Sequence, residues 1–320
     1  MLGSRTAPDA APPLPTDVLT LDDLGIRGLR HVLDLSRAIK GAPEEYRGTC
    51  SGGKLGMIFD KPSTRTRVSF EAAAWLLGML PIAMRPDELQ LGRGETVADT
   101  ARTLSLYLDA IAIRTFAQSR VEELAQWASI PVINALTDEH HPCQALADLM
   151  TVEEEFHAFD GVVLAFVGDG DNVCQSLIQA AALTGLQLRI ATPPGYEPAQ
   201  DILDAALRTA TSTGAGIVLT HDPREAVAGA NAVYSDVWTS MGRDAEREQR
   251  TRDFAGFTVD AGLMAGAAKD AIFLHCLPAH RGEEVTDEVI DGPQSRVWRQ
   301  AENRMHTEAG LLAALLRRPG

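Results

Sequence analysis

The chain has 320 residues, 45% of them apolar and 23% charged, which is an ordinary composition for a globular protein and excludes a disordered chain. At roughly one domain per 150 residues, this length predicts two domains. The 29 basic and 44 acidic residues give a net charge of −15, which argues against binding to nucleic acid or to an anionic membrane.

Sequence signals for membranes, export and metal are also absent. No apolar run approaches the roughly 18 residues that a membrane helix needs, and the beginning of the chain lacks the apolar core of a signal peptide. We therefore expect a cytoplasmic protein. The cysteines form neither a C-x-x-C pair nor the spacing of a zinc module, which predicts free thiols and no metal site; they are Cys50, Cys143, Cys174 and Cys276.

The first element after the N-terminus is an amphipathic helix. Residues 1–16 are rich in Ala and Pro without apolar periodicity, which predicts a flexible tail. Apolar residues then recur at helical spacing from Leu24 to Ile39, and this helix should end before Gly41. Next, the predicted strands are Leu55–Phe59, Ala110–Arg114 and Val132–Asn134, and the predicted helices are Ser69–Leu80, Val121–Ala128 and Cys143–Phe156.

A second series of alternating strands and helices begins at Gly161 and ends with a helix over 301–318. Two such series predict an α/β protein with two parallel sheets, each doubly wound, joined by long helices. The expected domains are 17–150, with the last helix packing back on it, and 151–300. The strands of the second series are Val162–Val167, Gln187–Thr192, Gly216–Thr220, Ala232–Asp236 and Ala271–His275; its helices are Asn172–Thr184, Ala199–Ser212 and Pro223–Ala228.

Ligands of parallel sheets bind beyond the carboxyl ends of the strands, and a polar motif follows the first strand. It reads D-K-P-S-T-R-T-R over residues 60–67. Ser63 and Thr64 suit a helix N-cap, whose free N–H groups combine with Arg65 and Arg67 into a trap for an anion such as phosphate. In so acidic a chain, an anionic substrate would need such a cluster. The alternative is an ordinary N-cap with two solvated arginines.

A second motif, D-E-H-H-P-C-Q over residues 138–144, follows another predicted strand. His141 and Gln144 lie three residues apart and should share a face of the helix that Pro142 begins. A neutral histidine can donate to a carbonyl oxygen, and a glutamine can bind an amide. The alternative is a pair of surface histidines; a metal shared by His140 and His141 is disfavoured, because adjacent side chains diverge.

The motif G-D-G-D-N over residues 168–172 is half of a dinucleotide fingerprint. Val173 stands where the fingerprint needs a glycine, and the next strand lacks the acidic residue expected at its end, which together disfavour NAD. We expect the glycines to let another ligand approach, with Asn172 supplying an amide.

Two further strands end at residues with a chemical function. Asp236 could hold an ammonium group, or cap a helix or turn. Cys276 is the best placed of the thiols and could, as a thiolate, accept or shuttle a proton; an inert buried thiol and a Cys–His nucleophile are the alternatives. His275 should point to the opposite face of the strand and so should not pair with Cys276. Arg304, near the start of the last helix, could reach an anion or be solvated.

In this order, the motifs resemble the aspartate/ornithine carbamoyltransferase family over about residues 21–316. S-T-R-T-R and H-P-x-Q are typical of the carbamoyl-phosphate half shared by the family, and D-x-W-x-S-M-G with H-C-L-P is typical of its ornithine-specific members. The motifs are F-x-K-P-S-T-R-T-R (59–67), Q-L-G-R-G-E-T-V-x-D-T-A-R (90–102), D-E-H-H-P-C-Q-A-L-A-D-L (138–149), D-V-W-T-S-M-G (236–242), H-C-L-P-A (275–279) and A-E-N-R-M-H (301–306).

The resemblance implies an enzyme of arginine biosynthesis that transfers the carbamoyl group of carbamoyl phosphate to the δ-amine of L-ornithine, giving L-citrulline and phosphate without a cofactor. A carbamoyltransferase for putrescine or N-acetylornithine is the alternative, and a non-catalytic binding protein is disfavoured because all of the family's chemical residues are present. Because family members reach into a neighbouring subunit's site with the residue matching Gln90, the resemblance also implies a homotrimer or a multiple of it.

The resemblance also implies roles for individual residues. Arg65, His141, Cys276 and Arg304 would be catalytic. We expect two departures from the family, an unusually long N-terminal tail and Asp171 where relatives commonly have an asparagine, to contact none of the implied site residues. The implied binding residues are Ser63, Thr64, Arg65, Thr66, Gln90, Arg114, His141, Gln144, Cys276, Leu277 and Arg304 for carbamoyl phosphate, and Asn172, Asp236, Ser240 and Met241 for ornithine.

Overall fold

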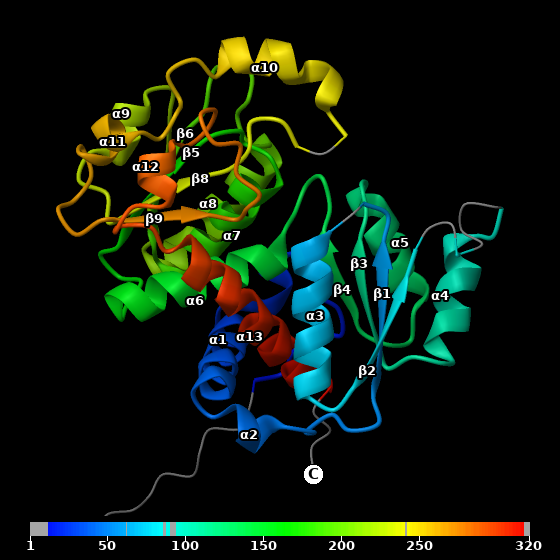
Figure 1. Ribbon diagram of the computed structural model, residues 1–320. Coiled ribbons are helices and arrows are strands. Elements are labelled where there is room, and N and C mark those ends of the chain that lie inside the picture. Colours follow the sequence, from blue (N-terminus) through cyan, green and yellow to red (C-terminus); the bar gives the residue numbers. More distant parts are fainter. Residues whose placement is uncertain (1–11, 62, 86–87, 90–93, 241, 317–320) are drawn as a thin grey trace, which may run out of the picture.

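The computed structural model describes residues 12–61, 63–85, 88–89, 94–240 and 242–316. These residues form two parallel β-sheets, each flanked by helices, with the first sheet and the second sheet in separate halves of the molecule (Figure 1). The predicted fold class, an α/β protein with two parallel sheets, is confirmed. Within the described part of the chain, no helix is both long and apolar enough to cross a membrane.

The first sheet has the strand order β2-β1-β3-β4. The order reverses direction between β1 and β3, and this reversal marks the place where parallel sheets bind ligands. The strands are β1 (Lys54–Phe59), β2 (Leu80–Met84), β3 (Ala110–Arg114) and β4 (Val132–Leu136), and the helices of this half are α1 (Gly25–Gly41), α2 (Pro43–Tyr46), α3 (Thr64–Leu76), α4 (Val97–Ser105), α5 (Gln118–Trp127) and α6 (Pro142–Phe156).

The second sheet has the order β7-β6-β5-β8-β9, with its reversal between β5 and β8. All neighbouring strands are parallel. The strands are β5 (Val163–Val167), β6 (Gln187–Ala191), β7 (Ile217–Thr220), β8 (Ala232–Ser235) and β9 (Ile272–His275), and the helices are α7 (Asn172–Thr184), α8 (Gln200–Thr213), α9 (Pro223–Val227), α10 (Arg247–Asp253), α11 (Ala261–Met264), α12 (Asp287–Ile290) and α13 (Val297–Leu316).

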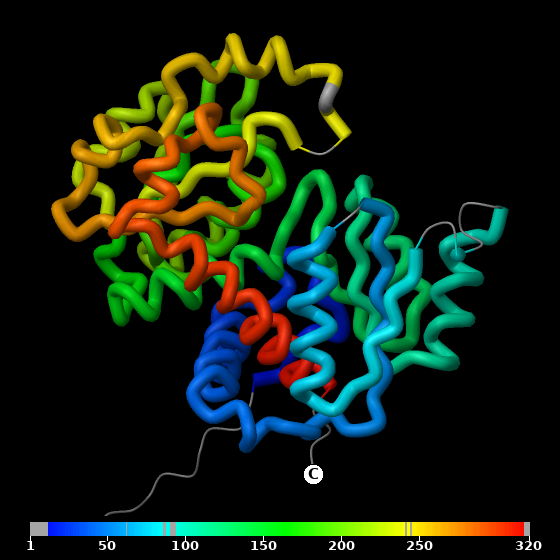
Figure 2. The backbone as a smooth tube through the Cα atoms, viewed as in Figure 1, coloured from blue at the N-terminus to red at the C-terminus, as the bar shows by residue number. Residues whose placement is uncertain are grey.

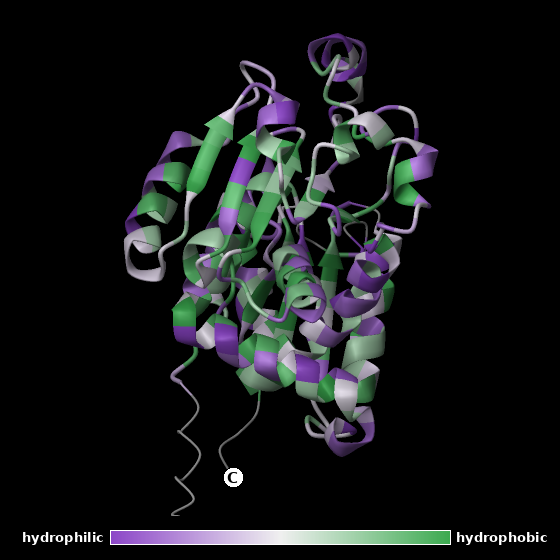
Figure 3. Cartoon of the chain, turned by 90° about the vertical axis from the view of Figure 1, so that its left-hand side faces the viewer, coloured by the Kyte–Doolittle hydropathy of each residue, from purple (hydrophilic) through white to green (hydrophobic). Residues whose placement is uncertain are grey.

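Alternate residues of the strands inside each sheet enter different hydrophobic clusters, as the two faces of a doubly covered sheet require. In β5, Leu164 and Phe166 enter one cluster while Ala165 and Val167 enter another. Most strand residues are accordingly apolar, with exceptions such as Arg189 in β6, and many of the polar residues lie on the helices (Figure 3). The cluster containing Leu164 extends through α6, α7 and α13 into the first sheet, so one continuous core joins the two halves.

Helix α13 returns from the second half to the first. It starts beside β9 and packs against α6, α1 and α3 (Figures 1 and 2). Gly310 makes the close approach to α1 possible, because a Cβ atom there would lie 2.1 Å from the Ser36 hydroxyl oxygen and 3.0 Å from its main-chain nitrogen. This path brings residues near the C-terminal end of the chain to the sheet that the chain forms first.

The predicted helix Ser69–Leu80 is wrong at both ends. Helix α3 begins at Thr64. The prediction started too late because the first turn is polar and the apolar periodicity begins only near Phe70. It ends at Leu76, and Gly78 then adopts a φ of 79° that turns the chain into β2. Strand β2 and the helices α2, α4, α10, α11 and α12 were not predicted, and the last helix begins four residues earlier than predicted. Residues 1–11 of the predicted tail lie outside the described residues.

Candidate active site

A cavity of about 250 Å³ lies between the carboxyl ends of the two sheets. Side chains from six of the sequence motifs line this cavity. Gln90 and Met241, which were also expected here, lie outside the described residues. The predicted residues that line the cavity are Ser63, Thr64, Arg65, Thr66, Arg114, His141, Gln144, Asn172, Asp236, Ser240, Cys276, Leu277 and Arg304.

The first side of the cavity contains the N-terminus of α3. Ser63 is its N-cap residue with an extended backbone, and Thr64, Arg65 and Thr66 form the first helical turn. The free N–H groups of such a turn favour an anion. Arg67, by contrast, has a half-exposed side chain, pairs with Glu71, Nε to Oε1, at 2.9 Å, and does not line the cavity, whereas Arg65 lines it although the residue is also exposed to solvent.

Four cationic side chains lie at or near this turn: Lys61, Arg65, Arg114 and Arg304. Burial, together with the nearby charges of Arg304 and Arg65, lowers the pKa of Arg114 to about 10. The fourth is Lys61, which is 5% exposed, places Nζ 2.6 Å from Asp138 Oδ1 and lies over the ring of Phe116. Lys61 was not among the predicted site residues, although it lies inside the D-K-P-S-T-R-T-R motif. This cluster supplies the local positive charge that an anionic substrate needs.

Arg304 of α13 connects the side chains of two other helices. Its Nη1 donates to Gln144 Oε1 at 2.7 Å and to His141 Nε2 at 3.3 Å. Its Nη2 donates to Thr66 Oγ1 at 3.2 Å and to Glu308 Oε1 at 2.8 Å. Only 3% of Arg304 is exposed, so these bonds fix the guanidinium in the cavity wall.

The Arg304 bond determines the tautomer of His141. A guanidinium can only donate, so His141 Nε2 accepts and the ring proton is on Nδ1. Burial and the neighbouring charges of Arg304 and Arg114 hold the pKa of His141 well below its usual value, which makes the ring neutral at pH 7. Among the described residues, Nδ1 has no hydrogen-bond partner. A neutral N–H donor of this kind suits a carbonyl oxygen.

The Gln144 amide is oriented by a buried carboxyl group. Its Nε2 donates to Asp148 Oδ1 at 2.7 Å, and Gln300 donates to the same oxygen at 2.6 Å. Burial raises the pKa of Asp148 to about 7 and that of Glu308, the partner of Arg304, to about 7 as well. With Nε2 engaged, the amide oxygen of Gln144 is directed toward Arg304.

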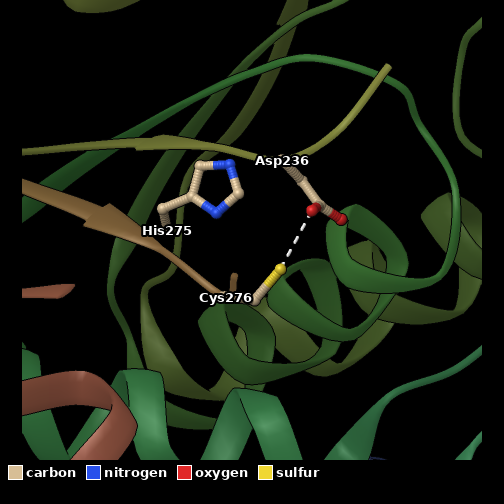
Figure 4. A group of neighbouring side chains, drawn as sticks. All are labelled: Asp236, His275 and Cys276. Carbon is tan, nitrogen blue, oxygen red and sulfur yellow. Dashed lines mark hydrogen bonds between the residues drawn. The ribbon is translucent and has the colours of Figure 1, made fainter. Parts of the chain in front are cut away.

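Asp236 and Cys276 meet on the second side of the cavity, at the ends of β8 and β9 (Figure 4). Cys276 Sγ donates to Asp236 Oδ1 at 2.9 Å. Burial and the Asp236 carboxylate raise the pKa of Cys276 well above its usual value, so the group is a thiol at neutral pH. In this arrangement Cys276 is a donor to Asp236, and the predicted role as a thiolate that accepts a proton stays a prediction.

His275 does not serve Cys276 as a catalytic base. Its Nδ1 accepts the N–H of Leu277 at 2.9 Å, and its Nε2 faces Glu284 Oε1 at 3.2 Å. One ligand atom each of Asp236, His275 and Cys276 lies within 4.8 Å of the others, a spacing that a metal could use. However, both ring nitrogens and the thiol are already engaged in the hydrogen bonds described.

The G-D-G-D-N turn supplies the remaining groups of the second side. Asn172 Nδ2 donates to the Thr137 carbonyl at 2.8 Å and so connects the two halves. Ser240 Oγ donates to Asp171 Oδ2 at 2.6 Å. The expectation that Asp171 contacts no site residue is therefore wrong, and burial raises the pKa of this carboxyl well above its usual value.

Gly170 serves the packing of the turn. A Cβ atom there would lie 2.4 Å from the main-chain nitrogen of Pro198 and 2.5 Å from the carbonyl oxygen of Tyr196. The expectation that the glycines of this motif admit a ligand is therefore wrong for Gly170, because the backbone of residues 196–198 fills that space.

The chain is similar throughout its described length to carbamoyltransferases. The family model for the carbamoyl-P binding domain of aspartate/ornithine carbamoyltransferase matches residues 16–154, and the model for the Asp/Orn binding domain matches residues 160–315. The ornithine carbamoyltransferase of Listeria monocytogenes serotype 4a is 53% identical over 301 residues, which are 94% of this chain and 95% of that protein.

Solved structures agree with these matches. The structure of ornithine carbamoyltransferase from Pyrococcus furiosus superimposes with a TM-score of 0.92 at 46% identity, covering 96% of this chain and 99% of that one. The enzyme of the same name from Gloeobacter violaceus gives a TM-score of 0.86 at 46% identity, covering 95% and 99%. The chain therefore belongs to the aspartate/ornithine carbamoyltransferase family.

Proposed function

We propose that this protein is an ornithine carbamoyltransferase, which forms citrulline and phosphate from carbamoyl phosphate and L-ornithine. The observation that carries the proposal is the division of one cavity into a cationic side on the first sheet and a side with carboxyl groups on the second. The first side suits a phosphorylated donor, and the second suits an amino acid. The names of the similar proteins support the same reaction.

The phosphate of carbamoyl phosphate would bind at the N-terminus of α3. Ser63, Thr64 and Thr66 offer hydroxyl and main-chain donors there, and Arg65 and Arg114 offer charge. On the departure of phosphate, the same two guanidinium groups would neutralise its charge.

The carbamoyl group would bind beside Arg304. The neutral His141 would donate to the carbonyl oxygen, and the amide oxygen of Gln144 would accept from the carbamoyl NH₂. Leu277 and Cys276 would line the opposite side. As charge develops on the carbonyl oxygen in the tetrahedral intermediate, Arg65, His141 and Arg304 would stabilise it.

Ornithine would be held by its α-amino and α-carboxylate groups on Asn172, Asp236 and Ser240. Met241 belongs to the same expected set. The δ-amine must be neutral to attack, and its pKa is near 10, like that of lysine, so the rate should rise with pH. Cys276, donating to Asp236, would orient the amine, and no covalent intermediate with the enzyme is required.

Several broader properties belong to the same proposal. These are a place in arginine biosynthesis, a cytoplasmic location, no nucleic-acid or membrane partner, and a division into domains over 17–150 and 151–300. A homotrimer, or a multiple of it, would follow from a role of Gln90 in the neighbouring site. Mixing inactive Gln90 and Arg65 variants should then restore activity, and a complete failure to complement would contradict shared sites.

The function is tested by measuring citrulline formation from carbamoyl phosphate with ornithine. Putrescine, N-acetylornithine and aspartate serve as parallel acceptors in the same assay. Ornithine should be preferred by a large factor in kcat/KM. Preference for putrescine or N-acetylornithine would instead support the alternative acceptors, and the absence of any carbamoylated product would overturn the proposal.

A further inference from the structure

The turn that follows β9 has an unusual backbone. Leu277 has a φ of 57°, in the left-handed region that non-glycine residues rarely adopt. Such a conformation is strained and persists only where surrounding contacts enforce it. Cys276 and Leu277 both line the cavity, so whatever holds this turn also places two groups beside the substrates.

His275 is the first of these contacts. It is only 1% exposed, and its Nδ1 accepts the main-chain N–H of Leu277 at 2.9 Å. Because Nδ1 accepts, the ring proton of the neutral side chain is on Nε2. That nitrogen lies 3.2 Å from Oε1 of Glu284, to which it donates. The ring thus connects a strained main-chain N–H with a buried carboxylate.

Glu284 holds the other end of the same turn. It is fully buried, and its Oε1 also accepts the main-chain N–H of His280 at 2.5 Å. Its own carbonyl accepts from the N–H of Val259 at 2.9 Å and from Ser235 Oγ at 3.4 Å. Glu284 is therefore anchored next to β8, and one carboxylate oxygen binds both ends of residues 275–280.

We propose that His275 and Glu284 are positioning residues, which hold the turn at Cys276 and Leu277 against the cavity for carbamoyl transfer. The proposal rests on the function given above. Neither side chain touches a substrate in this arrangement, since both ring nitrogens are engaged and Glu284 lies behind the turn. Displacing reacting or orienting groups by about 1 Å can cost 10²-fold in rate, so the pair should control turnover.

Two substitutions of His275 separate positioning from packing. In His275→Asn, the amide oxygen can take the place of Nδ1 and accept the N–H of Leu277, but the contact with Glu284 is lost. In His275→Gln, the amide reaches the place of Nε2 and keeps Glu284, but the N–H of Leu277 loses its acceptor. We expect kcat to fall about 10²-fold in His275→Gln and less than about 10-fold in His275→Asn.

Stability should follow the opposite order. His275→Asn leaves the buried Glu284 side chain with one donor fewer, so its Tm should be lower than that of His275→Gln. A more active and less stable His275→Asn variant therefore supports positioning. Activity that follows stability in both variants, or an unchanged kcat in His275→Gln, would overturn it.

Glu284→Gln keeps a side-chain oxygen that can accept from both donors, so it should lower kcat less than His275→Gln does. A loss of kcat as large as that of His275→Gln would overturn the proposal. Alkylation of Cys276 by iodoacetamide, measured by mass spectrometry, gives a readout independent of activity. Its rate should change in His275→Gln and not in His275→Asn, even if the wild type forms no citrulline and the proposed function fails.

Discussion

The two sides of the cavity occupy equivalent positions in their sheets and have opposite chemistry. On the first side, burial and the nearby charge of Arg304 lower the pKa values of both Arg65 and Arg114. On the second side, burial raises the pKa values of Asp236 and Asp171, and each carboxyl accepts a hydrogen bond from a neighbouring side chain. The comparison shows that a net charge of −15 says little about an individual site. Topology selects the strand ends, and the residue types there decide which ligand each side can bind.

The two sides are also supported differently. The cations of the first side are fixed by residues that themselves line the cavity, such as Gln144 and Thr66. The second side is supported from behind by Arg250 of α10, which binds Asp169 and donates to the Trp238 carbonyl at 2.7 Å. Variants of the first side should therefore affect binding directly, and variants of the second side should act more through position.

The largest effect is expected when the cationic side is broken. Arg65→Ala should lower kcat/KM for carbamoyl phosphate by about 10³-fold, because it removes charge both from the phosphate and from the developing oxyanion. Calorimetry should detect no binding of carbamoyl phosphate. Arg67→Ala is the matched control, since that arginine pairs with Glu71 outside the cavity. Retained affinity in Arg65→Ala would contradict the phosphate site.

The thiol on the other side should affect the chemical step alone. Cys276→Ala should lower kcat by about 10²-fold, since Asp236 loses the donor that orients it, while carbamoyl phosphate still binds. Cys276→Ser keeps a donor and should recover part of the rate. An unchanged kcat in Cys276→Ala would remove the thiol from the chemistry.

Asp148, the buried carboxyl group behind Gln144, should affect how the free energy of unfolding depends on pH. Folding raises the pKa of Asp148 from 3.8 to about 7, so its stabilising contribution is complete below about pH 4 and is lost as pH rises through 7. Asp148→Asn should flatten the decline in unfolding free energy between pH 4 and 7 by a few kcal/mol, as urea titrations at several pH values would show. Asp99→Asn on the surface is the control. An unchanged slope in Asp148→Asn would mean that this carboxyl is ionised throughout.

The smallest effect should come from Asp171. Asp171→Ala removes the acceptor of Ser240, and the KM for ornithine should rise by roughly 5-fold, the value of one hydrogen bond of about 1 kcal/mol. Asp171→Asn keeps an acceptor and should restore most of the affinity. A change in the KM for carbamoyl phosphate instead would contradict the placement of Asp171 on the ornithine side of the cavity.

The elements that the sequence predicts well are those whose pattern is local. Strand β3 and helix α7 have the predicted bounds, because a buried apolar run and a helix ended by Gly185 both leave a clear signal. Strand β2 was missed because it is half-buried at the sheet edge and contains Pro81. The first turn of α3 was missed because its polar residues face the cavity.

The sequence by itself determined which chemical groups follow the strand ends, and the motifs in their order indicated the family. Only the tertiary structure decided which of these groups meet. Arg304 reaches Gln144 because α13 crosses back to the first half, and His275 finds Glu284 because a turn folds behind β9. Periodicity and capping depend on neighbours a few residues away, whereas these contacts depend on how two sheets and a returning helix are packed around one core.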